Sequence, residues 1–350
     1  MIKSSFPLVV VSPHPANFEA FDGWSQRIHD IDKLLSQHTR LYVNLSTGHL
    51  EGIHDGLRKK THNSYEICLN PDSKNHLKLL EKSVFPSAKL IYIQTLHHAA
   101  YVQLILGETR FIVDIHGVVP EEESMLGNAD NSIYFETVEA DILKRALLNV
   151  VVSNNMRNHF AGKYSDLKSD SFLTLAIKPN DVSIIDKPKS NLGQDLPVKV
   201  VYLGGTQVWQ NVSEMFELAE LTNKFSSFSL YSADLESLRK HAKQFPDTNV
   251  VIGFTSREEL RGIYEENDFG LIIRNESIVN KVASPTKLFE YLANGVIPVI
   301  KYPMLGDFYD LGYRYITVDE FSAGFFPDNL PAVHQHDSVS CYPCCQSLDH

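Results

Sequence analysis

The sequence predicts an α/β protein made of two doubly wound parallel sheets, each with helices packed on it. The chain has 350 residues, more than one hydrophobic core usually supports, so two domains are expected. Short runs of β-branched and other apolar residues alternate with longer stretches of helical periodicity, as parallel strands with crossover helices require. This alternation occurs twice, and a polar segment separates the two series. Each half therefore has the pattern of a Rossmann-like domain.

The first half contains six apolar runs that predict strands buried on both faces of a sheet. They span residues 8–12, 41–44, 65–69, 89–94, 111–115 and 150–153. Between the first two runs, apolar residues from Trp24 to Leu35 recur at helical spacing. This periodicity predicts an amphipathic helix that packs on the sheet.

A polar segment between residues 178 and 197 is rich in Pro, Asn, Asp and Lys and lacks hydrophobic periodicity, as an interdomain connection does. The second series of apolar runs predicts strands at 198–203, 228–231, 249–252, 269–273, 297–301 and 315–318. The predicted division is an N-terminal domain over 1–180, a linker over 181–197, a C-terminal domain over 198–330 and an irregular tail over 331–350. The absence of a short-period repeat opposes solenoid and propeller architectures.

Charge and hydropathy restrict the function further. The formal net charge is -11 and the pI is about 5.7, which opposes general nucleic-acid binding because phosphate contacts need a clustered basic surface. No apolar run approaches the roughly 20 residues that cross a bilayer. The start of the chain also lacks the apolar stretch and cleavage site of a signal peptide, so we expect a cytoplasmic protein.

Two arrangements in the sequence resemble metal sites, and we expect neither to bind metal. Three of the four cysteines crowd the end of the chain with two histidines: Cys341, Cys344, Cys345, His334 and His336. This stretch lacks a second well-spaced ligand pair, so an irregular tail is expected there. Asp30 and Asp32 form a D-x-D string, but they fall inside the predicted first helix and point in different directions. No cofactor is expected.

The segment SPTKLFEYLANGVIPVI, residues 284–300, predicts a helix followed by a strand. Ser284 followed by Pro285 is a helix-start signal, with Ser as the cap and Pro as the first helical residue. Gly295 is the matching stop signal. The helix should therefore span residues 285–294.

The start of this helix predicts an anion site. Its free backbone N–H groups and the partial positive charge of the helix end act together with Lys287 in the first turn, and a diphosphate suits that site. Glu290 projects from the same face and is placed to accept hydrogen bonds from ribose hydroxyls. The alternative is an ordinary amphipathic helix whose Lys and Glu form a surface pair.

The same string resembles the donor-binding signature of glycosyltransferase family 4 and its relatives with the two-domain glycosyltransferase B fold. In that signature a Glu-bearing helix precedes a Gly and a Pro-Val strand. The resemblance extends to GFTSREELRGIYEENDFGLIIRNES and to VKVVYLGGTQVWQN, both upstream in the second half. It implies a nucleotide-sugar donor, such as a UDP- or GDP-sugar. The predicted donor-binding residues are Gly23, Gly204, Gly205, Gly253, Phe254, Arg274, Ser284, Thr286, Lys287, Leu288 and Glu290.

The resemblance implies separate tasks for the glycines of the second half. Gly204 and Gly205 would let the backbone approach the diphosphate, and the backbone near Gly253 and Phe254 would border the base.

Two positions depart from the family pattern. Val282 stands where many members carry a Glu that contacts the donor sugar, and the basic pair that commonly follows the glycine loop is absent. The phosphate charge would then rest mainly on Lys287, with Arg274 and Lys281 as helpers. Two explanations are open: the departures are features of a subtype of the family, or they mark a protein that has lost catalytic activity.

The first half has a matching element in FIVDIHGVVPEEE, where Asp114, His116 and Gly117 follow an apolar strand. Side chains at the carboxyl end of such a strand face the ligand crevice of an open sheet. The element resembles the family's Asp-x-His-Gly motif, whose His hydrogen-bonds the transferred sugar. His116 is therefore the candidate catalytic residue, although a strand-end His is also a common structural hydrogen-bonder.

Other side chains of the first half are candidates of lower rank. Glu121, Glu122 and Glu123 offer a general base for an acceptor hydroxyl, or form a solvated acidic turn. His97 and His98 face the crevice or simply begin a helix.

The resemblance also implies that the loop after the first strand lies close to the donor phosphates and the acceptor. Asp22, Gly23 and Arg27 are its candidate contributors, and Arg27 could equally be a surface residue.

The expected function is transfer of a hexose from a UDP- or GDP-sugar to a glycan or lipid-linked acceptor, as in surface polysaccharide assembly. Helix dipoles and Lys can stabilise the leaving diphosphate without metal, and family membership would imply retention of anomeric configuration. A lipid-linked acceptor would require transient docking at the inner face of a membrane. The alternatives are a nucleotide-sugar epimerase of the same fold and a non-catalytic partner that binds nucleotide-sugar or glycan.

Overall fold

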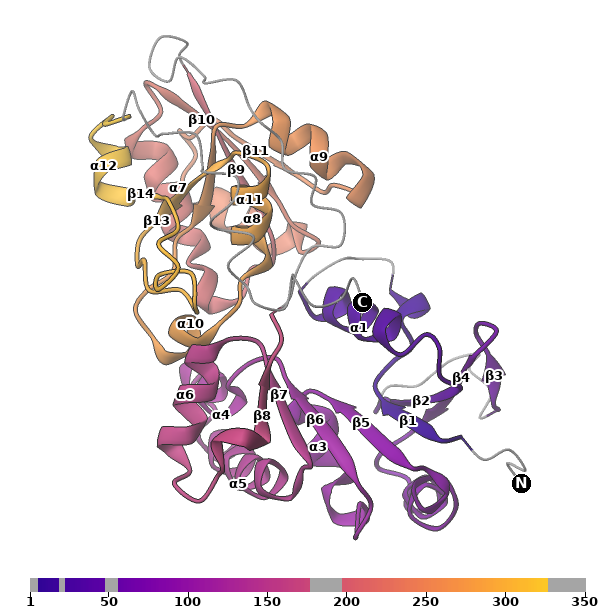
Figure 1. The fold of residues 1–350 in the computed structure, drawn as a ribbon. Helices are drawn as coiled ribbons and strands as arrows, with labels where there is room; N and C mark the ends of the chain where they lie inside the picture. Colours follow the sequence, from indigo (N-terminus) through magenta and orange to yellow (C-terminus); the bar gives the residue numbers. More distant parts are fainter. Residues whose placement is uncertain (1–5, 19–22, 48–55, 177–196, 327–350) are drawn as a thin grey trace. The chain divides into compact units, whose positions relative to one another are not determined.

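The computed structural model describes residues 6–18, 23–47, 56–176 and 197–326. The chain divides into two compact units, Met1–Ala176 and Ile177–His350 (Figure 1). The predicted linker, apart from Pro197, and the predicted tail with its Cys and His residues lie outside the described residues. The predicted domain boundaries therefore stay predictions.

The first unit contains an eight-stranded sheet. Its strands are β1 (Leu8–Val11), β2 (Arg40–Leu45), β3 (Arg58–Lys59), β4 (Ser64–Leu69), β5 (Leu90–Gln94), β6 (Phe111–Ile115), β7 (Leu148–Val151) and β8 (Phe172–Thr174). They lie in the order β3-β4-β2-β1-β5-β6-β7-β8, and only the β3–β4 pair is antiparallel. The six predicted strands are all present.

Two strands of this sheet were not predicted from the sequence. β3 has two charged residues, and β8 has three residues at the opposite edge. β3 carries no apolar residue, so hydrophobic periodicity does not reveal it, whereas β8 lies in the apolar stretch FLTLAI and was overlooked.

The helices of the first unit connect these strands. They are α1 (Gly23–Leu34), α2 (Lys74–Leu79), α3 (Leu96–Val102), α4 (Val119–Met125), α5 (Ala129–Arg145) and α6 (Asn154–Lys163), with short turns η1 (Pro15–Asn17), η2 (Leu80–Val84), η3 (Phe85–Ser87), η4 (Gln103–Ile105) and η5 (Ser169–Ser171). α1 is the predicted amphipathic helix, and its Ile31 packs with Tyr42 and Tyr92 of the sheet. The two aspartates of the D-x-D string diverge as predicted. Asp32 accepts hydrogen bonds from Arg40 and Tyr42 at 2.7 and 2.6 Å, while Asp30 accepts one from Gln26 on its own helix.

The second unit contains a fully parallel six-stranded sheet. Its strands are β9 (Val198–Leu203), β10 (Ser226–Tyr231), β11 (Val250–Gly253), β12 (Phe269–Ile272), β13 (Ile297–Ile300) and β14 (Ile316–Thr317). The order β11-β10-β9-β12-β13-β14 is that of a Rossmann domain, in which the chain reverses direction across the sheet after the third strand. The predicted fold class, two Rossmann-like parallel-sheet domains, is confirmed.

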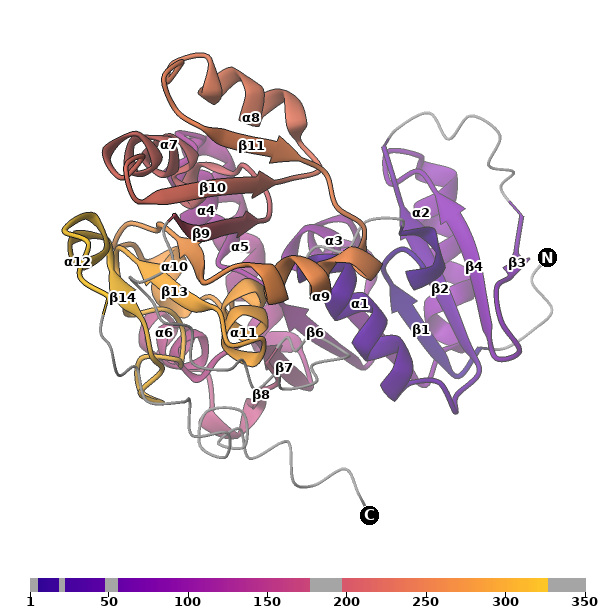
Figure 2. The same ribbon diagram turned by 90° about the horizontal axis from the view of Figure 1, so that it is seen from above.

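Helices cover both faces of the second sheet (Figure 2). They are α7 (Val212–Leu221), α8 (Leu235–Ala242), α9 (Arg257–Glu266), α10 (Ile278–Val282), α11 (Thr286–Ala293) and α12 (Val318–Ser322), with the short turn η6 (Val208–Gln210). Phe216 of α7, Leu238 of α8 and Phe321 of α12 share one buried cluster with the strands. On α11, Tyr291 packs so closely against Gly270 of β12 that any Cβ there would overlap its ring.

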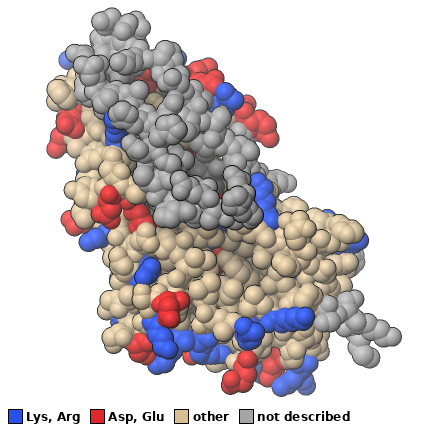
Figure 3. All heavy atoms as spheres, in the orientation of Figure 1, with Lys and Arg blue, Asp and Glu red and all other residues tan. Residues whose placement is uncertain are grey.

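Surface features of the described residues agree with the composition. None of their helices has both the length and the apolar character needed to cross a bilayer. On the face drawn in Figure 3, Lys and Arg side chains are interspersed with Asp and Glu rather than gathered in one basic area.

Candidate functional site

The second sheet has its topological switch point between β9 and β12, from which the chain continues in opposite directions across the sheet. In open parallel sheets, ligands bind beyond the carboxyl ends of the strands at such a point. Gly204 and Gly205 directly follow β9, and Arg274 follows β12. The structure therefore places three of the predicted donor-binding residues around one switch point.

Lys287 reaches the same place from the first turn of α11. Its side chain is only 8% exposed, and its Nζ donates to the Tyr202 hydroxyl at 3.2 Å and to Gln210 Oε1 at 3.3 Å. The Nζ also lies 4.5 Å from the centre of the Tyr202 ring, a cation–π contact. A Cβ on Gly204 would overlap the Nζ, so glycine at this position lets the lysine end lie where it does. 

Arg274 is the second cation of the group and is 6% exposed. Its Nη2 lies 3.4 Å from Gln210 Oε1 and its Nη1 lies 3.4 Å from Asn280 Oδ1, while its Nε has no partner within the described chain. Both bonds are long, and Gln210 serves two cations with one oxygen. This role of Gln210 was not predicted, because only the fold brings η6 close to Lys287 of α11.

The electrostatics of this pair indicate a site for an anion. Among the described residues, no carboxylate forms an ion pair with Lys287 or Arg274. Burial lowers the pKa of Lys287 well below its usual value, Arg274 lowers it further, and Glu290 raises it from a distance. Burial also lowers the pKa of Arg274. Two buried cations without a counter-ion are costly in isolation, and an anionic ligand would offset that cost.

The start of α11 differs from the prediction. Pro285 is the N-cap with φ -70° and ψ 112°, and helical geometry begins at Thr286. Ser284 therefore does not cap the helix, and its buried hydroxyl has no partner among the residues described. The predicted Ser cap is wrong because the chain enters the helix one residue later. Leu288 is fully buried, so its side chain packs in the interior.

Glu290 lies on α11 beside a side chain that sequence analysis missed. Its Oε2 accepts a hydrogen bond from the Tyr264 hydroxyl of α9 at 2.6 Å. Burial and the nearby Glu290 carboxylate raise the pKa of Tyr264 well above its usual value, so the phenol stays protonated and donates. Tyr264 lies in the stretch that resembles the family, but no spacing rule pairs it with Glu290. The surface Lys–Glu pair considered above is wrong, because Lys287 is buried and bonded elsewhere.

The remaining predicted glycines have local structural reasons. A Cβ on Gly205 would overlap the Gln207 side chain, and one on Gly253 would lie 3.1 Å from the Tyr231 ring. Gly253 ends β11, two strands from β9. Phe254 follows it and is 60% exposed, an aromatic side chain available to a ligand.

In the first unit, Asp114 is fully buried at the end of β6. Arg27 binds both its oxygens, from Nε to Oδ2 and from Nη2 to Oδ1 at 2.9 Å each, and the Tyr92 hydroxyl donates to Oδ2 at 2.8 Å. Burial alone would raise the pKa of Asp114, but Arg27 and His116 hold it below its usual range. The surface alternative for Arg27 is wrong, because the whole side chain is buried against Asp114. Gly23 is the first residue of α1, and Asp22 lies outside the described residues.

His116 lies two residues beyond Asp114, with its Nε2 3.5 Å from Asp114 Oδ2. This separation is too long for a strong hydrogen bond. Neither ring nitrogen has a hydrogen-bond partner within the part of the chain that is described. The structure thus leaves His116 at the carboxyl end of β6, with its Nε2 facing Asp114 and its buried Nδ1 without a partner among the described residues.

The three consecutive glutamates lie on α4 and differ in environment, so the predicted acidic turn is wrong. Glu121 accepts hydrogen bonds from His159 and Lys163 at 3.1 and 2.9 Å. Glu122 packs over Gly117, and burial raises its pKa to about 7, with nearby carboxylates adding to the effect. A carboxyl group with a pKa near neutral can take part in proton transfer, so Glu122 is the candidate among the three. 

The two consecutive histidines of the first unit begin a helix, which was one of the two expectations. His97 and His98 lie in the first turn of α3. Burial lowers the pKa of His98 to about 4.

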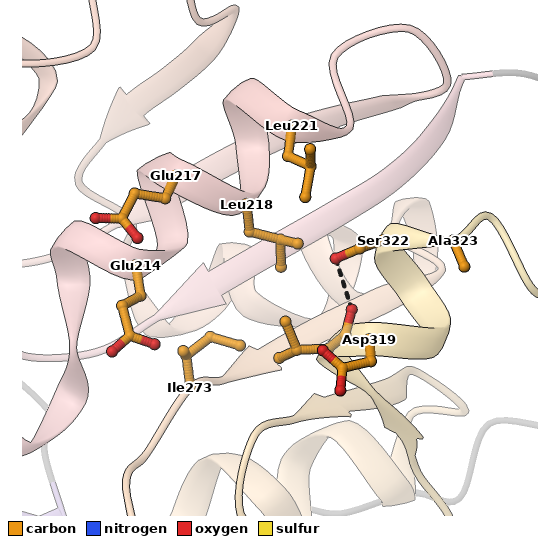
Figure 4. A pocket seen from close by; sticks show the side chains of 9 residues that line it. Glu214, Glu217, Leu218, Leu221, Ile273, Asp319, Ser322 and Ala323 are labelled. Carbon is orange, nitrogen blue, oxygen red and sulfur yellow. Dashed lines mark hydrogen bonds between the residues drawn. The ribbon is translucent and has the colours of Figure 1, made fainter.

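A pocket of about 500 Å³ lies elsewhere in the second unit, between α7 and α12 (Figure 4). Leu218, Leu221 and Ile273 line it together with the carboxylates of Glu214, Glu217 and Asp319. Unlike the Lys287 group, these carboxylates would repel a phosphate. We therefore place the candidate anion site at the switch point and not in this pocket.

No family model matches the sequence, and no curated protein matches it. Solved structures do match. A sucrose-phosphate synthase from Thermosynechococcus elongatus aligns with a TM-score of 0.65 at 12% identity, covering 91% of this chain and 88% of that one. A HepE protein from Anabaena in complex with UDP and glucose aligns with a TM-score of 0.63 at 11% identity, covering 91% and 88%.

A third match is a trehalose-6-phosphate protein from E. coli bound with UDP-2-fluoro glucose. Its TM-score is 0.61 at 15% identity, covering 91% of this chain and 90% of that one. At such identities the similarity establishes the fold. The chain has the two-domain glycosyltransferase B fold.

Proposed function

We propose that this chain is a glycosyltransferase that moves a hexose from a nucleotide-diphosphate sugar to a glycan or lipid-linked acceptor. The observation that carries the proposal is the pair of buried cations, Lys287 and Arg274, which share Gln210 and lack a described carboxylate partner. A diphosphate would supply the missing negative charge. Its oxygens can accept hydrogen bonds from the ammonium and the guanidinium together.

The same pair suits the chemistry of glycosyl transfer. When the bond between the anomeric carbon and the diphosphate oxygen breaks, the leaving nucleoside diphosphate gains negative charge. Fixed cations in a buried site stabilise that charge without reorganising. The first N–H groups of α11 add to the positive potential. We propose that transfer needs no metal ion.

Glu290 and Phe254 extend this proposal to the nucleoside. The Glu290 carboxylate, oriented by Tyr264, can accept hydrogen bonds from the ribose hydroxyls. The exposed Phe254 lies beyond β11, two strands from β9, or roughly 10 Å along the sheet. An exposed aromatic ring at that distance can pack against a nucleobase.

His116 is the proposed contact to the transferred sugar, and Glu122 is the candidate proton acceptor for the acceptor hydroxyl. Asp114 lies beside His116 and is itself fixed by Arg27 and Tyr92. Retention of anomeric configuration and a place in surface polysaccharide assembly belong to this proposal on the resemblance to family 4 alone.

The structural matches support UDP-sugars as the first donors to test. HepE from Anabaena was solved with UDP and glucose, and the E. coli protein with UDP-2-fluoro glucose. These proteins share their fold with this chain, and the experiment tests whether this chain also uses a UDP-sugar.

The decisive experiment is a mass-spectrometric assay of the full chain with a panel of UDP- and GDP-sugars, with and without acceptor glycans. Wild type should release free nucleotide from one donor, and Lys287→Met should not. Lys301→Met is the matched control, because Lys301 is paired with Glu214 at 2.6 Å and lies outside the proposed site. Equal turnover by wild type and Lys287→Met would contradict the proposal.

A non-catalytic nucleotide-sugar-binding partner is the second candidate function. The observation in its favour is Val282, which is 1% exposed in the interior, where the family pattern has an acidic contact to the donor sugar. In the same assay, binding of a donor without hydrolysis or transfer would favour this alternative. An epimerase would instead convert the donor sugar without releasing nucleotide.

A further inference from the structure

Three helices of the second unit, α8, α7 and α12, follow one another on one face of its sheet (Figure 2). α7 is the middle helix and contacts both of the others. All three pack on the strands through one hydrophobic cluster. Their outward side forms a surface that we call the three-helix face, and its two edges differ in charge.

The edge formed by α7 and α12 is acidic and hollow. The pocket of about 500 Å³ lies there, and Leu218 and Leu221 of α7 point into the space between the two helices (Figure 4). Glu217 and Asp319 also line the pocket, and both are exposed. Of the three carboxylates in the lining, only that of Glu214 has a cationic partner among the described residues. The pocket therefore combines an apolar floor with two unpaired negative charges.

The opposite edge of the same face is basic. The last turn of α8 and its C-cap carry Arg239, Lys240 and Lys243, all of them exposed. Within the described part of the chain, none of these three side chains forms an ion pair. The neighbouring His241 instead turns toward α7, where its Nδ1 lies 2.9 Å from Ser213 Oγ. Three unpaired cations thus lie one helix away from the acidic pocket.

The two edges are complementary. Lys and Arg side chains have a long apolar stem and a charged head. A basic side chain that enters the pocket can lay its stem on Leu218 and Leu221 and place its head beside Glu217 and Asp319. Residues 327–350, which follow the described part of the second unit, contain no Lys or Arg. A Lys or Arg for the pocket must therefore come from elsewhere.

Symmetry favours a second copy of this chain as the source. If a second copy is turned by 180° about an axis parallel to α7, its α8 lies over the pocket of the first copy. The first copy's α8 then lies over the pocket of the second. Such an isologous contact uses the same surface on both copies and closes at the dimer.

We infer that the three-helix face is a self-association surface through which two copies of this chain form a closed dimer. Arg239, Lys240 and Lys243 of each copy lie opposite Glu217 and Asp319 of the other. The inference does not depend on the proposed function, because none of these residues belongs to the proposed donor site.

The size of the face predicts a weak dimer. α7 has 10 residues, so the face is about 15 Å long, and three packed helices span about 30 Å. The resulting area, on the order of 450 Å² per copy, is below the roughly 800 Å² per partner of a standard interface. Exposed charge pairs add little each and are screened by salt. We therefore expect a dissociation constant on the order of 10 to 100 μM that rises with ionic strength.

Sedimentation equilibrium of the full chain, at about 5 to 500 μM and at low and high salt, tests this inference. Wild type should fit a monomer–dimer equilibrium that weakens at high salt. Glu217→Lys/Asp319→Lys places like charges opposite α8 twice in each dimer, and should weaken the dimer roughly tenfold or more. Lys240→Glu/Lys243→Glu should have the same effect. Combining all four substitutions should restore the wild-type constant to within about threefold.

Glu258→Lys/Glu266→Lys is the matched control. Both glutamates are exposed on α9, whose Tyr264 is bonded to α11 and not to the three-helix face. The control changes the net charge by the same amount as Glu217→Lys/Asp319→Lys, and should dimerise as wild type does. All the substituted side chains are exposed, so every variant should melt close to the wild-type temperature.

Several results would overturn the inference. Wild type could sediment as a monomer at every concentration, or the control could weaken the dimer as much as the charge reversals do. The combined variant could fail to recover, or the mass could grow beyond the dimer, as in an open assembly. A melting temperature several degrees lower for Glu217→Lys/Asp319→Lys, at unchanged mass, would show that the pocket is filled within one chain.

Discussion

Replacing Lys287 by Met separates ligand binding from folding more sharply than any other change in this chain. The substitution removes a cation that is 8% exposed and has no described carboxylate partner. Its hydrogen bonds to Tyr202 and Gln210 are long, 3.2 and 3.3 Å, so the attraction lost is modest and includes the cation–π contact with the Tyr202 ring. Removing the buried ammonium group also removes its desolvation cost, which offsets that loss. We expect the free energy of unfolding of the ligand-free variant to be no more than about 1 kcal/mol below that of wild type.

The effect on binding should be larger. A hydrogen bond to a charged group contributes about 1.5–3 kcal/mol, which corresponds to a Kd roughly 10- to 150-fold weaker without Lys287. At a nucleotide concentration of 100 times the wild-type Kd, the ligand stabilises wild type by about 2.7 kcal/mol. The same concentration would stabilise the variant by only about 0.3–1.3 kcal/mol.

Urea unfolding without nucleotide measures the stability of each ligand-free protein. Urea unfolding with UDP, or with GDP if wild type prefers it, measures the stabilisation by the ligand. Lys301→Met controls for the loss of a lysine and should retain the full ligand-dependent stabilisation. The reasoning fails if Lys287→Met unfolds several kcal/mol more easily without ligand. It also fails if nucleotide stabilises the variant as much as wild type.

Three other predictions concern single side chains. Glu290→Gln should shrink the preference for UDP over 2′,3′-dideoxy-UDP roughly tenfold, because a neutral amide accepts ribose hydroxyls less strongly than a carboxylate; an unchanged preference in calorimetry would contradict the ribose assignment. Glu122→Gln should be more stable than wild type at pH 8, by on the order of 3 kcal/mol, and equal to it near pH 4. The pKa of Glu122 in the folded state, about 7, exceeds the ordinary 4.5. Between these two pH values the folded state therefore binds a proton that the unfolded state has lost. The stability of wild type falls as the pH rises from the ordinary pKa to the folded one. Urea midpoints at both pH values test this sign. Arg27→Met should cost about 3–5 kcal/mol because it leaves Asp114 buried and charged, and adding Asp114→Asn should restore much of that loss; additive losses in a double-mutant cycle would show that the pair is not coupled.

The strands of both sheets were predictable because their signal is local. Runs such as residues 111–115 and 198–203 have the composition of buried strands, and β6 and β9 have those bounds. Most residues in such a run are apolar, and this composition can be seen without knowing which residues are neighbours in space. The edge strand β3 was missed because its two charged residues leave no trace of pairing in composition.

The candidate site was only partly predictable. Lys287 and Glu290 could be found because a helix start and a spacing of three residues are local features. The prediction of Ser284 as the helix cap was wrong by one residue, because Pro285 is the N-cap and local sequence signals do not define a helix end to a single residue. Tyr264 and Gln210 were missed because their bonds to Glu290 and Lys287 span 26 and 77 residues of sequence.

The sequence by itself determined the fold class, the two series of strands and a helix start suited to a phosphate, since each depends on residues that are close along the chain. The tertiary structure decided which polar groups find partners. Arg27 is paired with Asp114 across 87 residues, whereas Lys287 and Arg274 are buried without a carboxylate partner among the described residues. Desolvation makes those two positions informative, because a buried polar group without a partner is unfavourable until a ligand supplies one.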